Sequence, residues 1–350
     1  MNANPFLGVV LHSIGGFAAG SFYIPFKKVQ KWAWESYWLV GGLFSWIVTP
    51  SVVGFLTCPG LLKVLGSAPS RSILWCYLFG VMWGIGGLTF GLSMRYLGMS
   101  LGYALSLGFC ATFGTIIPPI FKGDFPGLLT ALSGQVTLGG ILVCLIGIAV
   151  CGMAGMRKER ELSTEQKKAS VSEFSFVKGV WVAVFAGVMS SCMAFAFAAG
   201  EPIAEHAVRN GAAGLFKNVP VLIVTLAGGF TTNFIWCVAL NIRNRSAGNY
   251  VKGDGATLLA NYLFSALAGI TWYMQFFFYG MGTTKMGKYN FSSWTIHMAF
   301  IIVFSNVWGI YLREWKGSSK RTYWIILVGI LVLIASTVVV GVGNYIASPK

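Results

Sequence analysis

Ten apolar stretches, each long enough to cross a lipid bilayer, follow one another along the 350-residue chain. A helix needs about 20 mainly apolar residues to cross the hydrocarbon core, and only helices and closed barrels satisfy every backbone hydrogen bond within lipid. The pattern therefore predicts an all-α membrane protein of about ten transmembrane helices. The predicted helices cover residues 5–26, 34–57, 72–93, 99–120, 135–155, 177–200, 216–240, 257–280, 290–312 and 322–346.

Composition supports this class and excludes others. Charged residues make up 10% of the chain, whereas a soluble domain carries about 25%. The formal net charge of +15 is also found in nucleic-acid-binding proteins, but here the Lys and Arg residues lie in short loops between apolar runs. We therefore expect a lipid bilayer around the chain and no nucleic acid as a partner.

The chain lacks the motifs of common enzymes and metal sites. Seven cysteines are scattered without a CxxC pair, which is typical of free buried thiols. His12, His206 and His297 do not have the spacing of metal ligands. The motifs of zinc proteases, serine hydrolases and P-loop ATPases are absent. We expect no metal, no cofactor and no enzymatic activity, and any active transport must draw on an ion gradient.

The distribution of basic residues predicts the orientation. Of the 25 Lys and Arg residues, 17 lie in loops on one side of the predicted bundle and 8 lie in loops on the other. Cytoplasmic loops carry the excess of basic residues. The charged linker 156–176 is therefore expected to be cytoplasmic, and both termini are expected to be periplasmic.

The linker divides the chain into an N-terminal five-helix repeat, 1–155, and a C-terminal five-helix repeat, 177–350. An odd number of spans in each half makes the two halves cross the membrane in opposite senses. Short identities recur at an offset of 185 residues, as in Ile141–Val143 and Ile326–Val328. Together these features predict a 5+5 inverted repeat, with a substrate site near midplane where the halves meet.

Several blocks of sequence are specific rather than compositional. They are PFKKV (25–29), LFGVMWGIG (78–86), MRYLGMS (94–100), WYMQFFFYG (272–280) and REW (313–315). With these blocks the chain resembles the L-rhamnose–proton symporter family of the drug/metabolite transporter superfamily, nearly from end to end. The resemblance implies a secondary active transporter of the bacterial inner membrane that imports a small neutral sugar, L-rhamnose or a related 6-deoxy sugar, by proton symport.

Two alternatives belong to other functional classes. One is an exporter or exchanger of another small metabolite, as in other drug/metabolite transporters. The other is a membrane sensor that transports nothing. Uptake of sugar into vesicles distinguishes these alternatives from a symporter.

Candidate sugar ligands come mainly from the span 257–280, where polar and aromatic residues at spacings of 3 and 4 form one stripe. This stripe is expected to face a wet cavity or the bundle interior. A neutral sugar needs hydrogen-bond partners for its hydroxyls and aromatic surfaces for its C–H face. The alternative is a hydrogen-bonded seam between helices without a ligand. The predicted substrate-binding residues are Tyr23, Trp83, Asn261, Trp272, Gln275, Tyr279, Trp294 and His297.

Candidate proton-coupling residues are the ionisable side chains inside predicted spans, since such residues are costly there and usually functional. Glu35 ranks first, His297 second and His12 third. The alternative for Glu35 is an interfacial carboxylate paired with Lys28 or Lys31. The alternative for His12 is a core histidine with hydrogen bonds to neighbouring helices.

Overall fold

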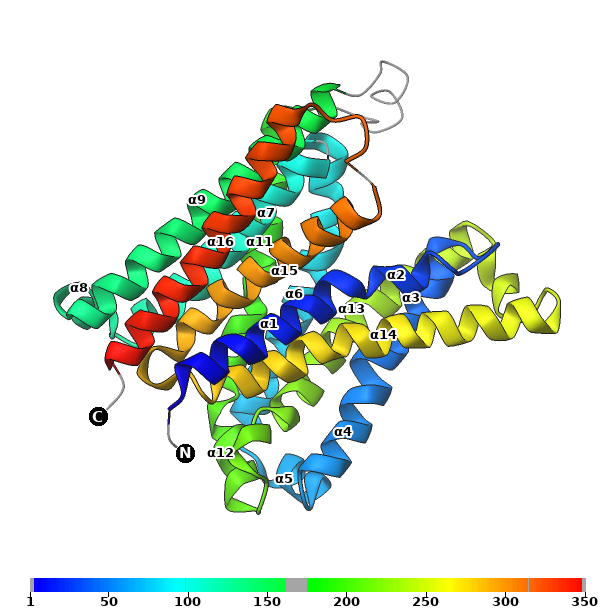
Figure 1. Ribbon diagram of the computed structural model, residues 1–350. Helices are drawn as coiled ribbons and strands as arrows, with labels where there is room; N and C mark the ends of the chain where they lie inside the picture. The colour runs from blue at the N-terminus through cyan, green and yellow to red at the C-terminus, as the bar shows by residue number, and fades with distance from the viewer. Residues whose placement is uncertain (1–2, 98, 162–174, 314, 348–350) are drawn as a thin grey trace.

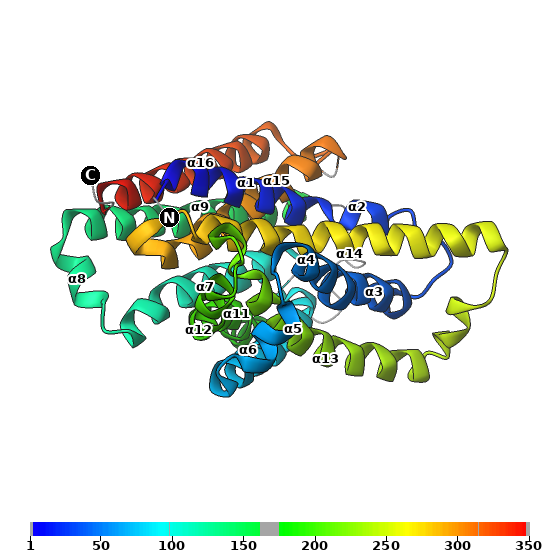
Figure 2. The same ribbon diagram turned by 90° about the horizontal axis from the view of Figure 1, so that it is seen from below.

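The computed structural model describes residues 3–97, 99–161, 175–313 and 315–347, and these residues form helices and short connections without a strand. Most of the predicted linker, residues 162–174, lies outside the described residues. Figures 1 and 2 show a bundle in which α1 begins and α16 ends at the same end. A chain that crosses the membrane an even number of times begins and ends on the same side.

The described elements before residue 162 are α1 (Pro5–Ser21), α2 (Tyr23–Phe26), α3 (Trp34–Leu43), η1 (Phe44–Val48), α4 (Thr49–Thr57), α5 (Leu61–Ser67), α6 (Ser70–Leu97), α7 (Met99–Phe121), α8 (Phe125–Thr130) and α9 (Leu132–Glu161). Those after residue 174 are α11 (Phe176–Ala199), α12 (Glu201–Arg209), η2 (Gly214–Phe216), α13 (Val219–Arg243), η3 (Ser246–Tyr250), α14 (Gly255–Thr283), η4 (Gly287–Ser292), α15 (Ser293–Tyr311) and α16 (Lys320–Ala347).

Each predicted span corresponds to a helix or to consecutive helices. Among the described residues, nine helical segments are long and apolar enough to cross a membrane. The one predicted span outside these nine segments, 257–280, corresponds to α14, which has 29 residues but a polar stripe that includes Asn261 and Gln275. The all-α membrane architecture with about ten spans is confirmed.

The polar stripe of α14 faces the interior. Asn261, Gln275 and Tyr279 are at most 5% exposed, whereas Leu259 and Leu263 on the opposite side are 60% exposed. The exposed leucines form an apolar surface suited to lipid. The predicted orientation of this helix is confirmed.

The closest helix pairs occur in matched sets. α9 lies beside α16, and α1 lies beside α14 in both views (Figures 1 and 2). α6 packs on α11 and on α13, while α14 packs on α1 and on α3 with η1. α7 packs on α11, while α1 packs on α15. If each span is replaced by the span five positions before or after it in the chain, every one of these pairs becomes another pair of the same set or itself.

Gly80 marks the closest approach of α6 and α13. A Cβ atom on Gly80 would collide with the backbone oxygen of Thr225. We expect Gly80→Ala to destabilise the protein by about 1–3 kcal/mol, because overpacking forces the two helices apart. Gly87, on the same helix, has no neighbouring atom within 4 Å of an added Cβ, so Gly87→Ala is the matched control. Thermal unfolding in detergent measures both variants, and equal midpoints would contradict the tight crossing.

Candidate functional site

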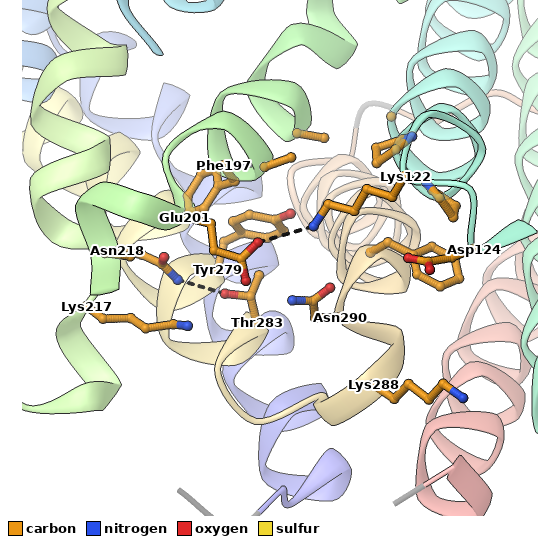
Figure 3. Close-up of a pocket in the computed structure, with 17 residues that line it drawn as sticks. Lys122, Asp124, Phe197, Glu201, Lys217, Asn218, Tyr279, Thr283, Lys288 and Asn290 are labelled. Atoms are coloured by element: carbon orange, nitrogen blue, oxygen red, sulfur yellow. Dashed lines mark hydrogen bonds and ion pairs between the residues drawn. The ribbon is translucent and has the colours of Figure 1, made fainter. Parts of the chain in front are cut away.

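A polar cavity of about 270 Å³ opens at the end of the bundle where α7 ends and α12 begins (Figure 3). We call it the polar cavity. The start of the chain lies near this cavity. The Asn4 backbone N–H donates to the backbone oxygen of Lys285, 2.9 Å away, and Lys285 lies between the lining residues Thr283 and Lys288. The labelled lining residues of the polar cavity are Lys122, Asp124, Phe197, Glu201, Lys217, Asn218, Tyr279, Thr283, Lys288 and Asn290.

Two contacts join different parts of the chain across the polar cavity. Lys122 Nζ lies 3.2 Å from Glu201 Oε2, and both side chains are about half exposed (Figure 3). Asn218 Nδ2 donates to the backbone oxygen of Gly280 at 2.8 Å and to Thr283 Oγ1 at 2.9 Å. The ion pair therefore links the end of α7 to α12, and Asn218 links the start of α13 to the end of α14.

A second, larger cavity of about 780 Å³ lies between α1, α3, α6, α13, α14 and α15. We call it the tryptophan cavity, after its most frequent lining residue. Helix α14 places the two cavities relative to each other, since Trp272 lines the tryptophan cavity and Tyr279 lines the polar cavity. Seven helical residues separate them, which corresponds to about 10 Å along the axis. The aromatic residues of the tryptophan cavity are Phe22, Tyr23, Trp34, Trp38, Trp46, Trp83, Phe90, Trp236, Trp272 and Trp308.

The indole rings of the tryptophan cavity contact one another. The ring centroids of Trp272 lie 5.4 Å from Trp46 and 5.5 Å from Trp83. Trp38 Nε1 donates to Asn233 Oδ1 at 3.2 Å, which fixes the orientation of that ring. Such rigid aromatic surfaces suit the C–H face of a sugar.

A buried pair of imidazole rings lies beside Tyr279, and neither ring lines either cavity. His12 on α1 and His297 on α15 are 0% exposed, and their ring centroids are 6.3 Å apart. Tyr279 lies 5.4 Å from His12 and 5.1 Å from His297. Phe276 lies 6.1 Å from His297 and 5.1 Å from Trp272, so it joins the pair to the tryptophan cavity.

All four ring nitrogens of the histidine pair lack a hydrogen-bond partner of good geometry among the described residues. Buried polar groups are normally hydrogen-bonded, and an exception needs an explanation. Imidazoles whose nitrogens lack a well-aligned protein partner are suited to bind a ligand hydroxyl or to take up a proton. The predicted alternative for His12, a core histidine with hydrogen bonds to its neighbours, does not describe this geometry.

Two glycines make the space for the histidine pair. A Cβ atom on Gly282 would lie 2.7 Å from His12 Cε1. A Cβ atom on Gly15 would lie 2.8 Å from the backbone oxygen of Gln275 and 3.4 Å from His297 Cε1. The absence of side chains at these positions lets α1 and α14 approach closely and seats the rings between them.

Two further sugar candidates lie close to the pair. Gln275 is 5% exposed on the inner side of α14. Trp294 is 1% exposed, and its Nε1 donates to the backbone oxygen of Cys110 at 3.1 Å. Because its donor is already used, Trp294 offers its ring rather than a hydrogen bond.

Asn261 lines neither cavity. Its Nδ2 donates to the Gln30 backbone oxygen at 2.8 Å, and its Oδ1 accepts from the Gln30 backbone N–H at 3.0 Å. It lies 18 helical residues from Tyr279, or about 27 Å along the axis. Asn261 therefore anchors the segment after α2 through its two hydrogen bonds to Gln30.

Glu35 also lines neither cavity. It is 4% exposed, and its Oε1 accepts from Ser246 Oγ at 2.6 Å and from Asn244 Nδ2 at 3.0 Å. Among the described residues it makes no ion pair with Lys28 or Lys31. The loop around η3 therefore supplies its partners.

The residues at the mouth of the polar cavity were not among the candidates predicted from the sequence. Lys122, Glu201, Asn218 and Thr283 lie at helix ends, where charged and polar residues are ordinary. The sequence contains one local indication of these residues. Pro118 and Pro119 precede Lys122, and Gly200 precedes Glu201. Both members of the ion pair therefore follow a residue that perturbs a helix.

Comparison with known proteins decides the family. The family model described as L-rhamnose-proton symport protein matches residues 1–346. The chain belongs to the L-rhamnose-proton symporter family. Its family places it among membrane transporters rather than enzymes, as predicted.

Members of the L-rhamnose-proton symporter family are similar to this chain over its whole length. The L-rhamnose-proton symporters of Yersinia pestis (strain Pestoides F) and Yersinia pseudotuberculosis serotype O:1b (strain IP 31758) are each 39% identical over 350 residues. Each match covers 98% of this chain and 99% of the relative. The match therefore includes both cavities and the histidine pair.

Proposed function

We propose that the protein imports L-rhamnose, or a related 6-deoxy sugar, together with protons across the bacterial inner membrane. The observation that carries the proposal is the buried histidine pair, which contacts Tyr279 of the polar cavity and is joined through Phe276 to Trp272 of the tryptophan cavity, within a chain of this symporter family. A transporter must expose one site alternately to the two sides of the membrane. The two cavities and the protonatable and aromatic side chains that connect them fit this requirement.

The aromatic rings among these connecting side chains form the proposed sugar site. Trp272 and Trp83 border it on one side, and Tyr279 and Trp294 border it on the other. Their rings offer apolar surfaces for the C–H face and the methyl group of a 6-deoxy sugar. The His12 and His297 nitrogens and the Gln275 amide offer partners for hydroxyls. Tyr23 lines the outer part of the tryptophan cavity and would meet the sugar there.

We assign the coupled proton to the histidine pair ahead of Glu35. The two rings contact Tyr279, which lines the polar cavity, and Phe276 joins His297 to Trp272 of the tryptophan cavity. The hydrogen-bond partners of Glu35, Asn244 and Ser246, line neither cavity. Two imidazolium charges with ring centroids 6.3 Å apart would repel strongly in a buried site, so the pair accepts one proton at a time. A sugar hydroxyl that bonds the second imidazole favours the singly protonated pair, which links proton occupancy to sugar occupancy.

The exchange of helix pairs between the two parts of the chain supports the inverted repeat of 1–155 and 177–350. Packing pairs that interchange with a shift of five spans are what a two-fold relation between halves requires. The two cavities would then open in turn as one half rocks against the other.

A substrate panel tests the proposed function. Purified protein in liposomes should accumulate labelled L-rhamnose when a pH gradient is imposed. Unlabelled L-mannose, which differs by one hydroxyl at carbon 6, should compete less well than L-rhamnose. Uptake that equilibrates but never concentrates the sugar would favour the exchanger instead.

The Lys122–Glu201 ion pair gives a first prediction for transport. Lys122→Glu should slow L-rhamnose uptake by roughly 1.5- to 5-fold, since an exposed ion pair contributes about 0.2–1 kcal/mol. The double variant Lys122→Glu/Glu201→Lys should recover the lost rate by restoring the attraction. A double variant as slow as the single one would show that the pair does not matter for transport.

Orientation gives a second prediction. All seven native cysteines are buried, so an added exposed cysteine gives a clear signal with a membrane-impermeant thiol reagent. Ser70→Cys should react from the periplasmic side, and Ala247→Cys should react only after the membrane is opened, because the basic loops are expected inside. The opposite pattern of labelling would reverse the proposed topology.

A further inference from the structure

A second buried polar cluster lies at the start of α3, outside both cavities. Its oxygen atoms belong to Glu35, Ser36, Asn241, Ser246 and Asn249. The first four residues are at most 9% exposed. The cluster is therefore largely shielded from solvent, and the proposed transport path does not use it.

The two amide groups turn their oxygens into the cluster. Asn241 Nδ2 donates to the Cys237 backbone oxygen at 2.8 Å, which leaves Oδ1 on the other side. Asn249 Oδ1 accepts from the Ala33 backbone N–H at 2.9 Å, which fixes that amide as well. Both assignments follow from backbone groups whose donor or acceptor role is certain.

The cluster has too few protons for its oxygen contacts. Ser246 Oγ lies 2.6 Å from Glu35 Oε1 and 3.2 Å from Asn241 Oδ1. Ser36 Oγ lies 3.3 Å from Asn241 Oδ1 and 3.0 Å from Asn249 Oδ1. Each hydroxyl has one proton to donate. Two of the four contacts therefore bring lone pairs together without a proton between them.

The carboxylate charge in the cluster has no cationic partner. Among the described residues Glu35 accepts hydrogen bonds from neutral donors only, Ser246 and Asn244, and forms no ion pair. A buried charge is costly unless it is paired. The buried hydroxyl of Tyr250 lies close to Ser36 and Asn241, although neither contact has good hydrogen-bond geometry.

We propose that this cluster binds a monovalent metal cation of about the size of Na⁺. Carboxylate, amide and hydroxyl oxygens are the ligands of hard cations. A single carboxylate balances one positive charge, and the short oxygen–oxygen distances favour a small ion. The spacing rules that excluded a metal from the sequence concern His and Cys ligands, and this site contains neither.

The bound cation would fasten two parts of the chain together. Glu35 and Ser36 belong to α3, whereas Asn241 belongs to α13 and Ser246 and Asn249 belong to η3. These two groups come from opposite sides of the predicted linker. The ion therefore stabilises the end of the bundle that is remote from the polar cavity, whether or not sugar is transported.

Two measurements on the purified protein test the cation site. Replacing N-methylglucamine by Na⁺ at constant ionic strength and mildly alkaline pH should raise the unfolding midpoint by at least about 2 °C. The same protein should retain radioactive sodium on a binding filter. Glu35→Gln and Ser246→Ala should each lose most of this shift and of the retained sodium. Asp254→Asn, which changes an exposed carboxylate at the same end and keeps the α14 cap, should lose neither.

The same measurements define the contrary results. Equal midpoints in Na⁺ and N-methylglucamine, with no sodium retained by the wild type, would overturn the proposal even if a variant failed to fold. A midpoint that rises only on acidification would assign the cluster to a proton on Glu35. Retention that is unchanged in Glu35→Gln and Ser246→Ala would place the ion elsewhere.

Discussion

A His12→Gln/His297→Gln double variant should exchange L-rhamnose across the membrane but lose its accumulation against a gradient. The two amides keep hydrogen-bonding groups at the positions of the histidine pair, but neither can take up a proton at physiological pH. One charge that crosses 100 mV supplies about 2.3 kcal/mol, or roughly 50-fold accumulation. The variant should fall from that ratio to equilibration. Accumulation and counterflow, measured in the same vesicles, separate the two activities.

The chain supplies matched controls for this experiment. His206 on α12 bonds to Ser67 Oγ at 2.8 Å and belongs to neither cavity, so His206→Gln should accumulate sugar as the wild type does. Glu35→Gln, at equal amounts of folded protein, should also accumulate it. If Glu35→Gln loses accumulation while the double histidine variant retains it, the proton belongs to Glu35, the first-ranked candidate from the sequence.

Trp272→Ala should raise the half-saturation concentration for L-rhamnose by roughly 5- to 150-fold. The change removes a ring that borders the tryptophan cavity and an indole donor, and a lost hydrogen bond to a buried hydroxyl costs about 1–3 kcal/mol. Trp272→Phe should recover the part of the affinity that comes from stacking, about 0.5–1.5 kcal/mol. Initial uptake rates at increasing sugar concentration measure the effect.

The control for Trp272 is a tryptophan on the outside of the bundle. Trp181 on α11 is 70% exposed, where it is suited to contact lipid. Trp181→Ala should leave the half-saturation concentration unchanged. Unchanged values in Trp272→Ala as well would remove the tryptophan cavity from the sugar path.

The sequence predicted the helices well because the bilayer imposes a simple rule on length and polarity. The span 257–280 illustrates this: Gln275 and Tyr279 were expected on an inward face, and they are buried there. The same reasoning brought Asn261 into the candidate site, since helical periodicity gives the face of a residue but not its depth. About 27 Å of helix separates Asn261 from Tyr279.

The contacts that define the site come from residues far apart in the sequence. His12 and His297 meet because Gly15 and Gly282 allow α1 and α14 to pack closely, and no local pattern announces that pairing. Glu35 was expected to carry the coupled proton, with pairing to Lys28 or Lys31 as the alternative, yet its partners Asn244 and Ser246 are about 200 residues away. Contacts of this kind depend on how distant helices pack together, and the periodicity of a single sequence does not contain that information.

The most direct test of proton symport is the proton movement that the sugar itself causes. Proteoliposomes in weakly buffered medium, without an imposed gradient, should alkalinise the medium when L-rhamnose is added outside, because each sugar that enters carries a proton with it. L-rhamnose that enters the same vesicles without any change in external pH would contradict proton coupling.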